Sequence, residues 1–483
     1  MPKEVLRQEA SDLPLPFPVS DLTTTFTIYN DDEGDVHNGI YLLGGCLAPY
    51  ADDPSAPGEY TCHMASNRNF VFDHLYRLYQ KRHDMPRARY RHTSNAVGGR
   101  IWIVGGRDSE DNVIQEVDIY NPILDTWETI GKIPPIYLRS DHTSFVLGDF
   151  LFIAGGYDQH TFASSSVLMI DIFASYDENK LKVKEVAPLH EARANAKALS
   201  YKGRGYVLGG FTHMNGYCEA LRTMEIYNPH TNRWERKPYG YGIMNYGRAD
   251  FAFLEYKDRF FVIGGETRKQ TGMLADYVDV DYYTPEYFQQ EGQCYNQALE
   301  TTAGEEITVG ARSKTLPVNS AEIYDPDGGP YALWTMIESG GLPLDGKLMR
   351  FVVAPWPDTD SLYAFGGIDF AMTSEGLNMC EENGLSDAEC IELSKEMVVF
   401  TYLKDVPSFP LWEVLTGLAA FLVLLIAGLW YWRRRRRLRR EAEGSGGKLG
   451  MDGDIALVVI PEMIRDNEEI QEEETLAEGK TLV

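Results

Sequence analysis

A doubled glycine at the end of a short apolar run recurs along this chain. The runs read GIYLLGG, RIWIVGG, FLFIAGG, GYVLGG, FFVIGG and LYAFGG. Their second glycines are Gly45, Gly106, Gly156, Gly210, Gly265 and Gly367. Successive pairs lie 50–61 residues apart, except for a last gap of 102 residues. A period near 50 residues indicates a repeat architecture, and this constrains the fold more than any local motif does.

A tyrosine and then a tryptophan follow the doubled glycine in several repeats. The pairs are Tyr120 with Trp127, Tyr227 with Trp234, and a looser version, Tyr324 with Trp334. The third repeat reads VLMIDIFAS and LKVKEV at these places instead. Each repeat therefore supplies four short strands, and large amphipathic rings can fill the wedge between neighbouring sheets. One such sheet cannot bury its faces alone, but several sheets around an axis can.

With these motifs the chain resembles the Kelch-repeat β-propeller family over residues 1–405. The resemblance implies an all-β propeller, and we count six blades; the alternative is seven, with one blade in the 102-residue gap. The family commonly closes its ring with a strand from the other terminus. After Gly367 only Glu396–Leu403 reads as a strand, so we expect Glu4–Gln8 to be the outer strand of the last blade. This strand would also cover an open sheet edge.

A transmembrane helix is predicted at residues 411–432, after a linker at 406–410. Residues 414–432 contain no charged residue, and a helix of this length can cross a bilayer. The sequence RRRRRLRR follows at once. We expect residues 433–483 to form a basic stop-transfer segment and a disordered acidic cytoplasmic tail. The propeller would then be extracellular or lumenal. Residues 1–25 lack the apolar core of a signal peptide. We therefore expect a leader to be missing from the printed chain; the alternative is a cytosolic adaptor with a tail anchor.

The net charge of −27 excludes a nucleic-acid surface, which needs clustered Lys and Arg. No Cys-x2-Cys pair is present, and the ten histidines are scattered, whereas the copper oxidases of this fold use two Tyr and two His. We therefore predict no catalytic residue, metal or cofactor, with a lumenal metal oxidase or sugar-modifying enzyme as the alternative.

His92 and His142 occupy equivalent places, 13 residues before a Gly-Gly pair, and we interpret them as structural turn residues. Thr481 and Val483 resemble the end of a PDZ-domain ligand.

Five arginines stand at one shared spacing before the first glycine of a pair: Arg89, Arg139, Arg193, Arg248 and Arg350. They fall where the innermost strand of each blade begins, so we expect them to ring one mouth of the axial channel. They would either pack between blades or contact an acidic ligand. The long loops after the Gly-Gly pairs share this face, and such loops usually carry binding. The sequence thus predicts a membrane-anchored recognition protein for a protein or glycan ligand.

All six cysteines lie in loops that follow a Gly-Gly pair: Cys46, Cys62, Cys218, Cys294, Cys380 and Cys390. We expect the pairs Cys46–Cys62, Cys380–Cys390 and Cys218–Cys294. The alternative is six reduced thiols in a cytosolic protein. Because disulfides persist in an oxidising compartment, the pairing also tests the side of the membrane on which the propeller lies.

Overall fold

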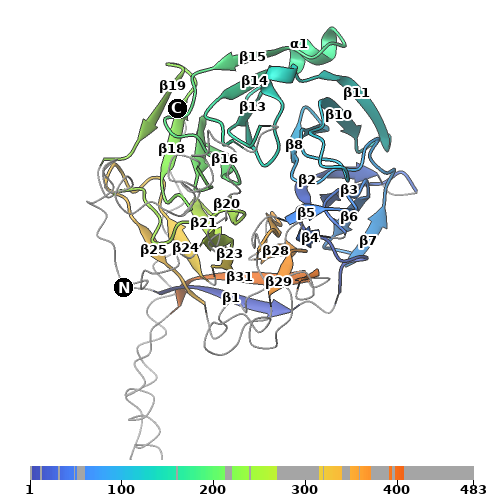
Figure 1. Cartoon of the computed structure of the whole chain (residues 1–483). Helices are drawn as coiled ribbons and strands as arrows, with labels where there is room; N and C mark the ends of the chain where they lie inside the picture. Colours follow the sequence, from blue (N-terminus) through green and yellow to red (C-terminus); the bar gives the residue numbers. More distant parts are fainter. Residues whose placement is uncertain are drawn as a thin grey trace, which may run out of the picture. The chain divides into compact units, whose positions relative to one another are not determined.

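The computed structural model describes residues 3–406 except 11–12, 31–32, 48, 52–59, 159–161, 213–219, 239–240, 269–314, 319, 340–348, 358, 360, 371–390 and 394–396. Within these ranges the chain is a ring of antiparallel sheets, each running outward from a central axis (Figure 1). The predicted all-β propeller is therefore confirmed.

Five blades are four-stranded sheets whose strands pair in chain order; three of them are uninterrupted, and in the first and fifth a two-stranded ribbon lies between the second and third strands. The first is β2 (Thr23–Asn30), β3 (Val36–Leu43), β6 (Asn69–Asp73) and β7 (Leu78–Lys81); the second is β8 (Thr93–Val97), β9 (Arg100–Val104), β10 (Glu116–Asn121) and β11 (Thr126–Lys132); the third is β12 (Thr143–Leu147), β13 (Phe150–Ala154), β14 (Val167–Asp171) and β15 (Val183–Val186); the fourth is β16 (Lys197–Tyr201), β17 (Arg204–Leu208), β18 (Met224–Asn228) and β19 (Arg233–Arg236); the fifth is β20 (Ala252–Tyr256), β21 (Arg259–Ile263), β24 (Ala321–Tyr324) and β25 (Trp334–Met336).

A five-stranded closing sheet joins the two ends of the propeller. Its order is β27 (Val352–Pro355), β28 (Ser361–Phe365), β31 (Met397–Val406), β1 (Lys3–Ala10) and β26 (Glu338–Ser339). The N-terminal strand β1 pairs antiparallel with β31, as the sequence predicted, but it is not the outer strand, because β26 pairs in parallel with its other edge. Leu362 packs into the core of the fifth blade, and Phe365 packs against the core of the first. The structure thus has five four-stranded blades and this closing sheet, which differs from six blades of one kind.

The Gly-Gly pairs are the places where neighbouring blades touch. Gly209 has φ +67°, and a Cβ there would lie 2.6 Å from the carbonyl oxygen of Arg248 in the next blade. Only glycine allows both the conformation and the close approach. On the other side of the blade the indole of Trp234 donates to the carbonyl of Ala187, 2.8 Å away in the preceding connection. The repeated residues therefore lock each blade to the one before it and the one after it.

Three β-ribbons extend from the loops between second and third strands. They are β4 (Pro49–Ala51) with β5 (Tyr60–Cys62), β22 (Glu266–Arg268) with β23 (Thr315–Pro317), and β29 (Ile368–Phe370) with β30 (Ile391–Leu393). They belong to the first blade, the fifth blade and the closing sheet, which are neighbours in the ring (Figure 1). The third blade instead inserts α1 (Ile172–Asp177) between its last two strands, and η1 (Pro135–Tyr137) connects it to the second blade.

The predicted linker, membrane span at 411–432 and tail at 433–483 lie outside the described residues, as do Thr481 and Val483. Among the residues that are described, no helix is both long and apolar enough to cross a bilayer.

Candidate binding face and axial channel

Six residues with left-handed backbone angles form a closed ring around the axis, one from each blade and one from the closing sheet. Their φ angles are 45–56°. Each N–H donates to the carbonyl of the residue before it in the ring, over 2.8–3.3 Å, and the last bond joins Asp21 to Arg350. These ring residues are Asp21, Arg91, Asp141, Asn195, Asp250 and Arg350. The backbone thus closes the propeller at the face that carries the Gly-Gly loops, here called the Gly-Gly face.

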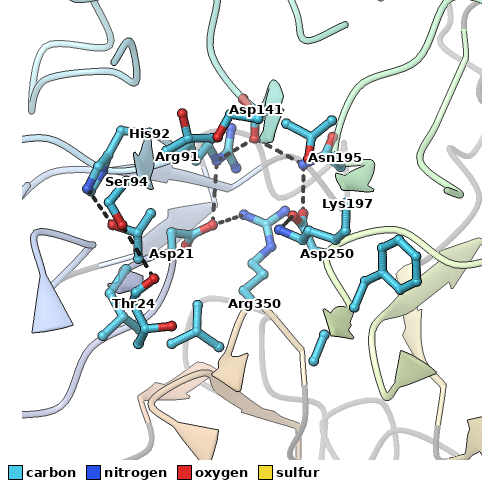
Figure 2. Close-up of a pocket in the computed structure, with 18 of the residues that line it drawn as sticks. Asp21, Thr24, Arg91, His92, Ser94, Asp141, Asn195, Lys197, Asp250 and Arg350 are labelled. Atoms are coloured by element: carbon cyan, nitrogen blue, oxygen red, sulfur yellow. Dashed lines mark hydrogen bonds and ion pairs between the residues drawn. The ribbon is translucent and has the colours of Figure 1, made fainter. Parts of the chain in front are cut away.

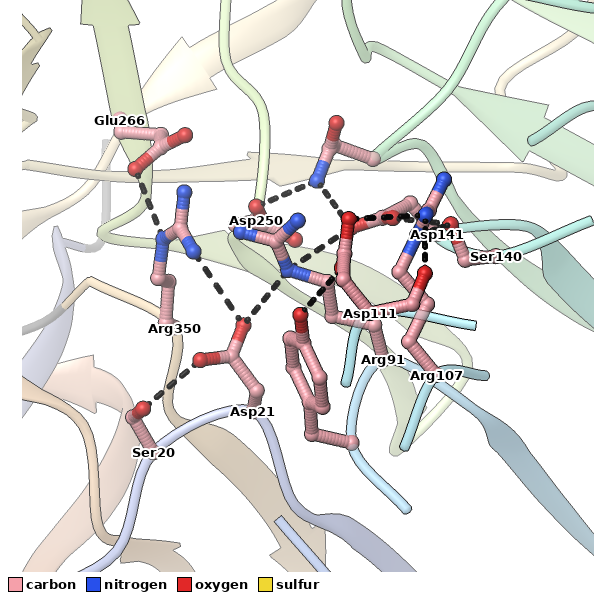
Figure 3. A network of polar contacts seen from close by, with 12 residues as sticks. Ser20, Asp21, Arg91, Arg107, Asp111, Ser140, Asp141, Asp250, Glu266 and Arg350 are labelled. Atoms are coloured by element: carbon pink, nitrogen blue, oxygen red, sulfur yellow. Dashed lines mark hydrogen bonds and ion pairs between the residues drawn. The ribbon is translucent and has the colours of Figure 1, made fainter. Parts of the chain in front are cut away.

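The ring side chains pair with one another, as Figure 3 shows. Arg91 Nε lies 3.3 Å from Asp141 and 3.7 Å from Asp21, and Arg350 lies 3.5 Å from Asp21. Asn195 donates to Asp141 over 3.0 Å and to Asp250 over 2.6 Å. Three aspartates and two arginines give −1, and Lys197, 3.4 Å from Asp250, brings the sum to zero. The ring therefore presents paired charges rather than an open ion site.

Burial and pairing act together on the pKa values of these groups. Burial raises the pKa of Asp141, and the neighbouring Asp250 adds to the rise while Arg91 opposes it. Burial lowers the pKa of Arg350, but Glu266 and Asp21 outweigh it and the net change is upward. Burial also lowers the pKa of Arg91, but the charge of Asp141 does most to outweigh it, and the net change is again upward. Both guanidinium groups thus stay charged because carboxylates surround them.

A cavity of about 270 Å³ lies in the channel directly beneath the ring (Figure 2). The innermost strands line it. On one side they present hydroxyl and amide groups, such as Ser94, Asn95 and Ser144; on the other they present Phe253 and Val353. Asn95 donates to Ser144 over 2.6 Å, so part of the polar wall is already satisfied. The ring residues line the end of the cavity at the Gly-Gly face.

Four of the five predicted arginines lie elsewhere than expected. Arg89, Arg139, Arg193 and Arg248 are 0–6% exposed, and none of them lines the cavity. In each, Nη1 donates to the carbonyl of the first glycine of the pair in the same blade. The prediction that these four ring the channel mouth is therefore wrong, and they pack inside their blades. Whether any arginine contacts a ligand stays a prediction.

Arg350 does lie at the channel, but in a different position of the repeat. In the closing sheet Val352 pairs with Phe365, whereas in the second blade Thr93 pairs with Val104. The closing hairpin is thus two residues longer. Counting 16 residues back from its first glycine therefore gives a ring residue, Arg350, whereas the same count in the blades gives a buried arginine such as Arg89. The other ring residues were missed, although each follows two residues after Val19 or a repeated arginine.

His92 and His142 are buried between blades. Their Nε2 atoms contact the hydroxyls of Thr23 and Thr93 at 3.0 and 2.9 Å. A Cβ on Gly105 would lie 2.6 Å from the His142 ring, so the imidazole packs against the Gly-Gly pair of the preceding blade. Burial lowers the pKa of His142 to about 3 and that of His92 well below its usual value. Both therefore serve packing as neutral rings.

The ribbon of the first blade carries a disulfide. Cys46 and Cys62 are bonded, with Cα atoms 5.7 Å apart, as the sequence predicted. The bond joins the residue after the Gly-Gly pair to the end of β5, so it fixes the base of the ribbon. Cys218, Cys294, Cys380 and Cys390 lie outside the described residues, and their two pairings stay predictions.

Comparison with known proteins agrees with the blade geometry. Residues 35–265 match a family model described as the KLHDC2/KLHL20/DRC7 Kelch-repeats domain. These 231 of the 483 residues are similar to Kelch-repeat domains. The chain is 26% identical over 241 residues to beta-scruin of Limulus polyphemus, covering 50% of this chain and 25% of that protein. It is also 26% identical over 231 residues to Kelch-like protein 25 of Xenopus tropicalis, covering 46% of this chain and 38% of that protein.

The chain thus spans between a quarter and two fifths of these relatives, so their whole activities do not transfer to it. A solved structure titled "Structure of YjhT" matches 81% of this chain and 99% of its own, with a TM-score of 0.51 and 14% identity. Likeness at that identity shows the fold alone. A Kelch propeller is suited to protein binding, and the ligand must be argued from this chain's own faces.

Proposed function

We propose that this chain is a membrane-anchored recognition protein that binds a protein ligand on its Gly-Gly face. The observation that carries the proposal is the grouping of three β-ribbons, β4–β5, β22–β23 and β29–β30, on neighbouring sheets of that face. Elongated loops on a rigid scaffold commonly carry binding. The disulfide at the base of the first ribbon limits its movement and so lowers the entropy lost on binding.

A broad ligand suits this face better than a small one. The ring residues narrow the channel behind the ribbons with paired side chains, so a ligand arriving there meets mainly the surface of the ribbons and the ring. The ring charges sum to zero with Lys197, and the repeated arginines are buried. These observations remove the main argument for an acidic ligand. A glycan held between the ribbons is the second form of the proposal, and a PDZ partner at Thr481 and Val483 would act separately in the tail.

The anchor and its orientation rest on the sequence. The uncharged run at 414–432 and the arginines after it favour one span with a cytoplasmic, disordered tail. The Cys46–Cys62 disulfide supports an extracellular or lumenal propeller. We also propose that the closing sheet acts as a sixth blade, because it supplies the sixth ring residue, Arg350.

Photo-crosslinking from single positions of the full chain tests the binding face. Met64 is 55% exposed at the first ribbon, and Leu75 is 73% exposed on the opposite face. A photoreactive amino acid at position 64, expressed in the native cell, should give a discrete protein adduct on denaturing gels. The same group at position 75 is the matched control and should give none. Protein adducts from position 75 alone would contradict the proposed face.

A further inference from the structure

The face opposite the Gly-Gly face, here called the hairpin face, carries a row of exposed apolar side chains. It holds the loops between first and second strands and between third and fourth strands, because the strands of each blade are antiparallel. The row runs over the first three blades: Val36 62% exposed, Leu75 73%, Tyr76 62%, Leu124 67%, Phe173 71% and Tyr176 49%. Groups of exposed large apolar residues mark interaction surfaces.

Two tyrosines of the row are held by side chains that flank it. The Tyr76 ring meets His37 edge-on, with centroids 5.4 Å apart. The guanidinium of Arg100, from the second blade, lies 5.9 Å from the centre of the Tyr176 ring in the third. The contact of Arg100 with Tyr176 therefore bridges the second and third blades on this face. The aromatic members of the row include tyrosines, which favour the interface between water and lipid.

The chain also leaves the propeller on the hairpin face. Strand β31 is the third strand of the closing sheet, so its last residue, Val406, lies at the same end as the loops of the row. Only four residues separate Val406 from the start of the proposed span at Leu411. Five Cα–Cα steps reach about 18 Å at most. The ten residues of β31 extend about 33 Å, so this tether cannot carry the opposite face to the bilayer.

We propose that the hairpin face rests on the lipid bilayer, with the apolar row inserted among the headgroups and the Gly-Gly face directed away. The inference rests on the proposed membrane anchor. Exposed carboxylates (Glu33 and Asp35) and exposed cations (Arg77 and Lys180) both lie on this face, so the lipid that fits is uncharged overall, such as phosphatidylcholine. The channel beyond the ring then faces the membrane, and the ribbons project to the far side.

A photoactivatable phosphatidylcholine with its reactive group near the headgroup tests this in vesicles holding the full chain. We expect lipid adducts on residues 411–432 and also on peptides containing Leu124 and Phe173. The Leu75→Ser, Tyr76→Ser double variant should reduce the adducts on those two peptides several-fold. The matched control is Ile136→Ser, because Ile136 is 84% exposed on the Gly-Gly face, and it should change nothing. Equal melting temperatures would show that all chains are folded.

The outcomes separate the inference from the anchor. Adducts on the span but none on the hairpin-face peptides would overturn the inference and leave the anchor standing. Adducts on the Gly-Gly face, or a double variant that labels like the parent, would also overturn it. A chain that washes off the vesicles with no adduct on the span would overturn the anchor, and the inference with it.

Discussion

Arg193 shows what the repeated arginine does in this propeller. Its Nη1 donates to the carbonyls of Gly209 and Thr223, and its Nη2 lies 2.8 Å from Glu225. Both side chains are completely buried. Burial raises the pKa of Glu225, but Arg193 and the N–H of His190 outweigh it, and the net change is downward. The arginine thus ties the end of the second strand to the third and holds a buried carboxylate in its charged form.

Replacing Arg193 with Met should lower the free energy of unfolding by about 3–5 kcal/mol, because it leaves a buried carboxylate without its main partner. The matched control is Arg204→Met. Arg204 lies 2.8 Å from Glu235, but both side chains are more than 40% exposed, so the expected loss is below about 1 kcal/mol. Urea unfolding of both variants gives the comparison. Similar losses would contradict the structural role.

The buried histidines predict how stability depends on pH. The folded pKa of His142 is about 3, below its usual value near 6.5, and that of His92 is also well below it. Their contribution to the stability of the folded state is fully present above pH 6.5 and is lost as the pH falls toward the folded pKa. Each histidine should lower the free energy of unfolding by roughly 1.4 kcal/mol for each unit by which the pH falls within this window.

Urea unfolding of the parent at pH 7.5, 6.0 and 5.0 measures this slope. Replacement of His142 by Gln should make the slope shallower by one histidine. Replacement of the exposed His230 by Gln should leave it unchanged. A slope that does not change in the His142 variant would contradict the burial of a neutral ring.

Glycine serves two separate purposes in the strands of this propeller: it forms hairpin turns, and it allows close contact between blades. The fourth blade contains one glycine that serves only the turn and another that also serves the contact. Gly203 and Gly209 both have positive φ, +75° and +67°. A Cβ on Gly203 would meet nothing within 4 Å, whereas one on Gly209 would lie 2.6 Å from the Arg248 carbonyl. Gly203 therefore serves only the hairpin turn, and Gly209, in the doubled glycine, also serves the contact between blades.

The Gly203→Ala change should cost about 1–2 kcal/mol of unfolding free energy, from backbone strain alone. The Gly209→Ala change should cost about 1–3 kcal/mol more, because a backbone carbonyl must move. Thermal melts of the two variants, read by circular dichroism, give the difference. Equal melting temperatures would show that the blades do not meet at this glycine.

The elements also show how far the sequence could predict the fold. Repeated glycines and aromatics predicted the propeller, and the absence of a readable last strand correctly predicted β1 in the closing sheet. Of the five arginines at the shared spacing, only Arg350 lies at the channel, because the hairpin after Val352 is two residues longer. Spacing along the chain cannot reveal a hairpin's length. The ring was missed because its members differ in charge and size, from Asp21 to Arg350, and share only a left-handed backbone.

At the scale of the whole molecule, the two faces have different proposed roles. The Gly-Gly face carries three ribbons and the closed ring, and the hairpin face carries the apolar row and the end of β31. A propeller held by a four-residue tether would present its ribbons away from the membrane, where a partner can reach them. Both roles depend on the span at 411–432 and on the side of the membrane to which the propeller belongs.

Protease protection in sealed microsomes, prepared from cells that express the full chain, tests that claim most directly. We expect protease outside the vesicles to remove the tail after about residue 433, while the propeller and span survive as one fragment until detergent opens the membrane. Antibodies against the propeller and the tail distinguish the two parts. A tail that survives while the propeller is digested, or a propeller released in soluble form, would contradict the account.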